Sequence, residues 1–134
     1  MTNPVQKRIQ IRNEQGQTMT EFALVLPVLA LILFAVIQFG IVFNNYVQLT
    51  DATRAGARKA AVSRQAADPG GTAEAAVRAS AKDLKQSDLN VTVSSSWQAS
   101  TDVSVTATYP YSVSLLGMVV KSGRLSSTTT ERVE

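Results

Sequence analysis

Glu21 is a lone carboxylate at the start of a long apolar run. No charged residue occurs between Glu21 and Asp51, and between Phe22 and Phe43 only Pro27 and Gln38 interrupt the hydrophobic series. A charge carried into hydrocarbon is costly, so an acid at this place needs a compensating partner. The sequence therefore predicts that Glu21 takes part in an interaction that a simple membrane anchor would not need.

Composition argues against several classes of function. The chain has no cysteine and no histidine, which removes disulfides, the usual zinc ligands and the common nucleophile-and-base pairs of hydrolases. The formal net charge of +3 is concentrated near the start of the chain, because ten basic and nine acidic residues remain after residue 16. We therefore expect that the protein is not an enzyme, and that it binds no cofactor, metal, small-molecule substrate or nucleic acid.

The apolar run has the length of a membrane-spanning helix. Its 22 residues, 22–43, would extend about 33 Å as an α-helix, close to the thickness of a bilayer core. A buried core helix is the alternative, but a small domain cannot easily enclose a segment that is apolar on every face. Lys7, Arg8 and Arg12 precede the run against Glu14, so we expect a single pass with the N-terminus in the cytoplasm.

The expected organisation has three parts. Residues 1–16 form a flexible polar leader, residues 17–65 form one long helix that continues beyond the bilayer, and residues 66–134 form a small α+β domain. Thr18 or Thr20 can cap the helix start. Pro27 removes a backbone hydrogen bond, so we expect a kink or a short unwound stretch near residues 24–27.

Small residues recur along the helix. Ala52, Gly56 and Ala60 are four apart and share a face, where another helix or a sheet can approach closely, and Gly40 permits the same in the apolar run. Arg54 and Arg58 form a second stripe, which is either a solvated polar face or a binding surface; Asp51 can pair with Arg54.

The remainder predicts a short helix followed by strands. The DPGG segment at residues 68–71 should stop the long helix, and a second helix capped by Thr72 should cover residues 72–85. Alternating apolar residues then predict an antiparallel hairpin with its turn near residues 98–101, a loop over 115–124, and an edge strand over 125–133. The fold class is α+β with about three to four strands, and the core or rim of the sheet holds Trp97, Tyr109 and Tyr111.

Residues 15–65 resemble the N-terminal signature of the TadE-like family, the minor pilin-like proteins of tight-adherence (Flp) pilus systems. The resemblance rests on "GQTMTEFALVLP" and the helix that follows, and extends more loosely to "VTATYPYSV" and "TTTERVE". It implies a pilin-like fold and cleavage by a prepilin peptidase between Gly16 and Gln17. Glu21 is then the fifth residue of the mature chain, as in type IV pilins. Phe22 departs from the tyrosine that family members often carry.

The resemblance further implies a role in pilus assembly and surface adhesion. Cleavage would create an ammonium at Gln17 that can pair with Glu21 of its own or a neighbouring subunit. The implied partners are the peptidase, other pilin and pilin-like subunits, the pilus assembly platform of the inner membrane, and membrane lipid. A membrane-anchored or exported binding module unrelated to pili is the alternative, and an N-terminus beyond Phe43 or an uncut Met1 would favour it.

Overall fold

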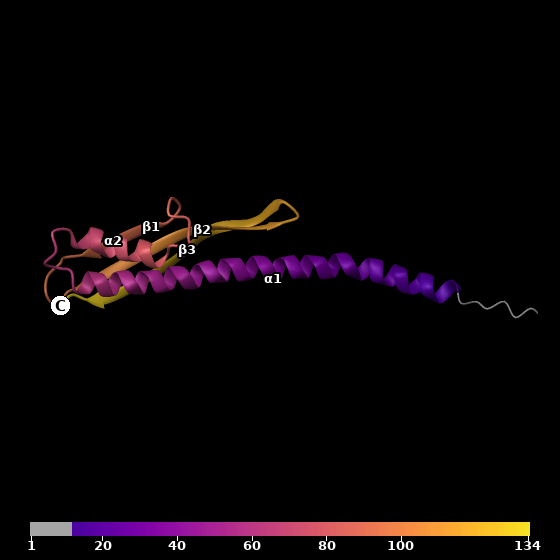
Figure 1. Ribbon diagram of the computed structural model, residues 1–134, viewed down its shortest axis with the longest axis horizontal. Coiled ribbons are helices and arrows are strands. Elements are labelled where there is room, and N and C mark those ends of the chain that lie inside the picture. Colours follow the sequence, from indigo (N-terminus) through magenta and orange to yellow (C-terminus); the bar gives the residue numbers. More distant parts are fainter. Residues whose placement is uncertain (1–11) are drawn as a thin grey trace, which may run out of the picture. The chain divides into compact units, whose positions relative to one another are not determined.

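The computed structural model describes residues 12–134, with side chains from Gly16 onward. The expectations for residues 1–11, and for the side chains of Arg12 and Glu14, therefore lie outside the described residues. Two helices are followed by three strands (Figure 1). The α+β class, the long apolar helix, the short second helix and the antiparallel sheet are confirmed.

Helix α1 covers Arg12–Ala61. It begins five residues before the expected start at Gln17, because the polar residues ahead of Gly16 are compatible with a helix, and Gly16 alone does not break it. It ends four residues before the expected Gln65, in a turn where the Ser63 N–H donates to the carbonyl of Ala60 at 3.1 Å. Thr18 and Thr20 thus lie inside the helix, and the expectation that either caps it is wrong.

Pro27 lies within α1, and the helix is continuous on both sides of it. Of the two alternatives expected at residues 24–27, the unwound stretch is therefore wrong, and the kink stays a prediction. Proline deletes a single backbone hydrogen bond, and the apolar residues on either side continue the helical geometry. Figure 1 accordingly draws α1 as one unbroken coil.

Helix α2 covers Pro69–Ser80 and begins earlier than expected. Asp68 is its N-cap: the Asp68 carboxylate accepts a hydrogen bond from the Gly71 N–H at 2.9 Å, and Pro69 occupies the first turn. Proline suits this position because its missing N–H would have no helical partner there. The DPGG segment thus starts α2 and does not stop α1, and Thr72 lies one turn inside the helix.

The three strands form one antiparallel sheet in the order β1-β2-β3. Strand β1 covers Asn90–Ser95, β2 covers Asp102–Leu115 and β3 covers Met118–Arg132. The first hairpin and its connection agree with expectation, but the predicted loop over 115–124 is wrong. Leu116 and Gly117 make a two-residue turn with φ values of 51° and 83°, which joins two strands that are longer than expected.

One core joins the end of α1 to α2 and the sheet. Inward-facing Val103, Val105 and Ala107 alternate with more exposed neighbours along β2. The other buried apolar residues are Leu49, Ala52, Ala57, Ala60, Ala61, Ala73, Val77, Ala81, Leu84, Leu89 and Val133, with Trp97 and Tyr109 packed partly buried against them. This core belongs to a compact unit, residues 37–134, that we call the head.

Candidate functional site

The residues around Gly16 lie on the first turns of α1, and their side chains bond within the helix. The Gln17 amide donates from Nε2 to Glu21 Oε1 at 3.0 Å. The Thr20 hydroxyl donates to the Gly16 carbonyl oxygen at 2.9 Å. Both interactions join residues four apart, which share a helix face. The exposed Glu21 carboxylate thus accepts from a neutral donor of its own chain, and among the described residues it has no ion pair.

Phe22 begins a series of large apolar side chains that are exposed on every side of α1. Phe22 is 61% exposed, Leu24 71% and Phe39 70%. The helix is long and apolar enough to cross a membrane, with a mean hydropathy of 2.7 and none of the most apolar stretch buried. An exposed apolar surface of this extent is unfavourable in water and is typical of contact with lipid. Gly40 lies in this series, with open space where a Cβ would be.

The small-residue stripe of α1 is buried within the head. Ala52, Gly56 and Ala60 are fully or largely covered. A Cβ on Gly56 would collide with Cγ2 of Val77 and would lie 3.3 Å from both the Ala73 carbonyl oxygen and Val105 Cγ1. The stripe therefore receives the chain's own α2 and β2, and the close approach it allows is used inside the subunit.

The neighbouring arginine stripe is solvated. Arg54 Nη1 lies 3.5 Å from Asp51 Oδ1, with both side chains more than 60% exposed. An exposed pair of this kind adds little to stability. Arg58 is also exposed, in the last turn of α1, where a positive charge complements the helix dipole.

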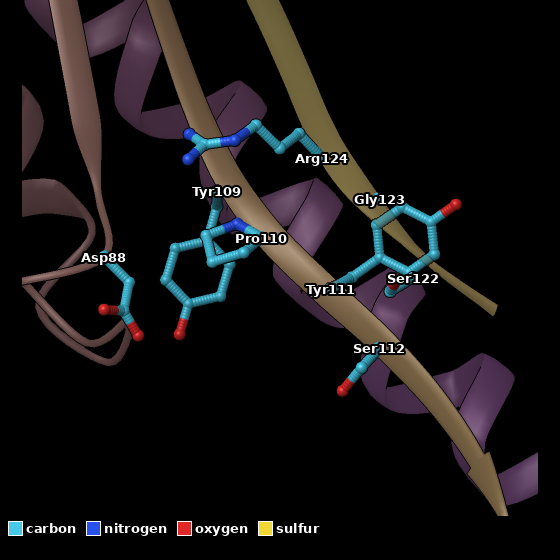
Figure 2. Close-up of a pocket in the computed structure, with 8 residues that line it drawn as sticks. All are labelled: Asp88, Tyr109, Pro110, Tyr111, Ser112, Ser122, Gly123 and Arg124. Carbon is cyan, nitrogen blue, oxygen red and sulfur yellow. The ribbon is translucent and has the colours of Figure 1, made fainter. Parts of the chain in front are cut away.

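Sequence reasoning did not anticipate an open hollow of about 580 Å³ beside the middle of the second hairpin (Figure 2). Its polar groups include the Asp88 carboxylate and the Arg124 guanidinium. The Tyr109 hydroxyl accepts a hydrogen bond from the Lys85 N–H at 3.3 Å. Tyr111 covers Gly123, where an added Cβ would lie 3.0 Å from the ring. The hydrogen bond of Tyr109 and the contact of Tyr111 with Gly123 indicate that both tyrosines have packing roles.

No cluster of acidic, histidine or cysteine side chains able to hold a metal ion occurs in the part of the chain from Gly16 onward. The remaining candidate site is the start of α1, where the Gly16–Gln17 peptide bond and the Glu21 carboxylate lie close to the apolar run. Residues 16–58 match the family model described as TadE-like protein. This segment is TadE-like.

The TadE-like segment starts at the glycine singled out in the sequence. It includes Gln17, Glu21 and Phe22, runs through the whole apolar series, and reaches the buried Gly56. The resemblance is thereby confirmed over residues 16–58, and the match suggests involvement in tight-adherence pilus systems. Comparison with curated proteins and with solved structures finds no match for the chain.

The TadE-like segment ends inside α1, three residues before the helix ends at Ala61. Ala60, α2 and the three strands all lie beyond residue 58. Within the segment, the residues at positions 16–22 are far from the core in sequence, while Leu49, Ala52 and Ala57 belong to it. Helix α1 therefore has two distinct parts: a start whose side chains are exposed, and an end that contributes buried residues to the core of the head.

Proposed function

We propose that the chain is a minor pilin-like (pseudopilin) subunit that a prepilin peptidase cuts between Gly16 and Gln17, and that acts in assembly of a tight-adherence pilus and in surface adhesion. One observation carries the proposal: the TadE-like segment contains a glycine followed five residues later by the carboxylate that opens the apolar run. A helix N-terminal dipole could favour an acid at Glu21, by about 0.3–1 kcal/mol, but it gives no reason for Gly16.

Hydrolysis of the Gly16–Gln17 bond would give the Glu21 carboxylate a charged partner. Hydrolysis adds water across the Gly16–Gln17 peptide bond, leaving a carboxylate on the leader and an ammonium on Gln17. Gln17 already faces Glu21 one helical turn away. The neutral amide contact of the uncut chain is then joined or replaced by a charge-assisted one, within the subunit or across to a neighbour. The ion pair favours one axial register of packed helices more than it adds to stability.

The membrane helix and the head then have distinct tasks. Residues 22–43 hold the subunit in the inner membrane with the leader in the cytoplasm, and the part of the head after Phe43 lies on the other side. Contact with other pilin-like subunits is made through the apolar helix, where Gly40 leaves room for a neighbouring backbone.

N-terminal sequencing of the protein isolated from producing cells tests the cut. A start at Gln17 in cells with the peptidase, and at Met1 in cells without it, is the expected result. A start beyond Phe43, or an uncut chain in both strains, contradicts the proposal and favours an exported or simply anchored module.

Glu21→Gln tests the role of the charge. The variant retains side-chain size and a hydrogen-bonding oxygen, so we expect normal membrane insertion and normal cleavage, with reduced pilus assembly. Normal piliation in this variant would show that the ion pair is not needed. Gln17→Ala serves as the matched control, because it removes the amide contact of the uncut chain and keeps the new ammonium.

A further inference from the structure

The second hairpin extends beyond the rest of the sheet. The last rung of β1 on β2 pairs Asn90 with Thr108, whereas β2 and β3 continue together to Leu115 and Met118. Figure 1 shows this pair of strands running on past β1. An isolated two-stranded hairpin is marginally stable in water. The distal part of the hairpin therefore lacks the support that the first half receives from a third strand.

The end of this hairpin, residues 115–121, which we call the hairpin tip, is apolar and exposed. Its outermost large side chains are 75%, 71%, 65% and 68% exposed, in the order Leu116, Met118, Val119 and Val120. Single exposed apolar residues are common, but a contiguous group marks a surface that meets something other than water.

The turn at the tip uses an unusual residue. Leu116 has a φ of 51°, a conformation in which asparagine, aspartate or glycine is favoured. A polar residue at this position would give a better turn and better solubility. Leucine thus keeps an apolar group at the outermost position at a cost in backbone strain.

The charges that the hairpin itself carries near the tip have one sign, and Asp88 borders the hollow that Arg124 also lines. Residues 103–130 contain Lys121 and Arg124 and no aspartate or glutamate. A basic surface bordering an apolar tip complements anionic lipid headgroups above hydrocarbon, as in proteins that lie in the membrane interface.

Within the head, the hairpin extends toward the end at which the apolar part of α1 lies. The Glu134 N–H donates to the Ala61 carbonyl at 3.0 Å, and Ser127 Oγ lies 3.2 Å from Thr53 Oγ1. Strand β3 therefore runs parallel to this part of α1, and its first residues extend toward the Ile37 end of the head. From Ser127 to Met118 the strand covers about 30 Å, and from Thr53 to Ile37 the helix covers about 24 Å. The tip is long enough to reach the level at which the apolar run enters the head.

We propose that the hairpin tip inserts into the headgroup and upper acyl layer of an anionic bilayer, with Lys121 and Arg124 binding lipid phosphates. This would give the head a second attachment to the membrane that α1 spans. The proposal does not depend on cleavage after Gly16, and it is tested on the uncut chain.

The absence of cysteine allows single labelled positions in the full chain. Val119→Cys reports on the tip, with Met118→Cys as an independent second reporter. Ala99→Cys is the matched control, since it is exposed in the turn at the other end of the sheet. Each variant carries an environment-sensitive fluorophore and is reconstituted into vesicles of phosphatidylcholine alone or mixed with phosphatidylglycerol.

We expect a blue-shifted emission at positions 118 and 119, and severalfold stronger quenching by lipids spin-labelled near the headgroup than at position 99. The effect should be larger with phosphatidylglycerol, and Lys121→Glu with Arg124→Glu should remove that difference. Equal quenching at positions 99 and 119 would overturn the proposal. A blue shift at positions 118 and 119 that grows with the protein-to-lipid ratio, without quenching by the spin-labelled lipids, would also overturn the proposal. It would show that the tip contacts a second copy of the chain.

Discussion

Thr53 on α1 and Ser127 on β3 share a buried hydrogen bond, with 3.2 Å between Oγ1 and Oγ, although 74 residues separate them in sequence. Thr53 Oγ1 also donates to the Thr50 carbonyl at 2.9 Å and accepts from the Thr129 hydroxyl at 3.1 Å. One hydroxyl thus connects the helix to the last strand.

Thr53→Val should destabilise the head by about 1–3 kcal/mol, because the shape is retained while the Ser127 hydroxyl is left buried without its partner. Denaturant unfolding of the full chain in detergent, followed by the fluorescence of Trp97, measures the change. Thr106→Val is the control, since its bond to Thr128 is exposed. An equal effect of the two substitutions would contradict a special role for Thr53.

Gly56→Ala should destabilise the head by about 1–3 kcal/mol, because its new methyl group would press on Val77 and on the Ala73 carbonyl. The same unfolding experiment measures it. Gly40→Ala adds the same methyl group where nothing lies within 4 Å, so the stability of the head should not change. If the two variants unfolded alike, close packing at Gly56 would not be limiting.

Asp68→Ala should cost about 1 kcal/mol, because the N–H of Gly71 loses its capping acceptor. Asp68→Asn keeps an oxygen acceptor at the N-cap and should lie close to the original chain in stability. Comparison of the unfolding midpoints of the three proteins checks this. A similar loss in the asparagine variant would indicate that charge, and not the cap, is what matters at this position.

Thr20→Ala should speed cleavage after Gly16, if the proposed processing occurs. The Thr20 hydroxyl bonds the carbonyl of the bond to be cut, and a peptidase must release that oxygen before water can add to it. Loss of a hydrogen bond worth about 0.5–1.5 kcal/mol predicts a rise of about 2- to 10-fold in the rate. The rate is measured by mass spectrometry of the purified chain incubated with its peptidase.

Thr20→Ser retains the hydroxyl and is the control for that measurement. Its rate should stay near that of the original chain. A rate that falls in the alanine variant would show that the peptidase itself uses the Thr20 side chain.

Periodicity in the sequence predicted most of the elements. The unbroken apolar run identified α1, and the alternation of Val103, Val105 and Ala107 identified β2 and its inward face. These patterns succeed because burial selects apolar residues with the period of the element. The boundaries were less accurate, since DPGG contains residues that suit both a turn and a helix start. Only the packing of α2 on α1 decides between them.

The hairpin tip was missed for a related reason. Leu116 and Gly117 give no strong turn signal, and the apolar residues around them lie on both faces of a two-stranded ribbon, so no alternation is visible. At the start of α1, the spacing of Gly16 and Glu21 was recognised from the sequence. The bonds of Gln17 and Thr20 were not, because a side-chain rotamer cannot be deduced from residue type.

The contact between Val133 and the remainder of the head bears on biosynthesis. Val133 is 1% exposed, its N–H donates to the Thr101 carbonyl at 2.8 Å, and its own carbonyl accepts from Ser100 at 2.9 Å. The alanine-lined side of α1 packs against Ala73 and Val77 of α2 and against Val105 of β2, so it stays exposed until the ribosome has made these later residues, and Val133 joins the core last. Nascent chains, and variants truncated before Val133, would present this incompletely packed core to chaperones and proteases.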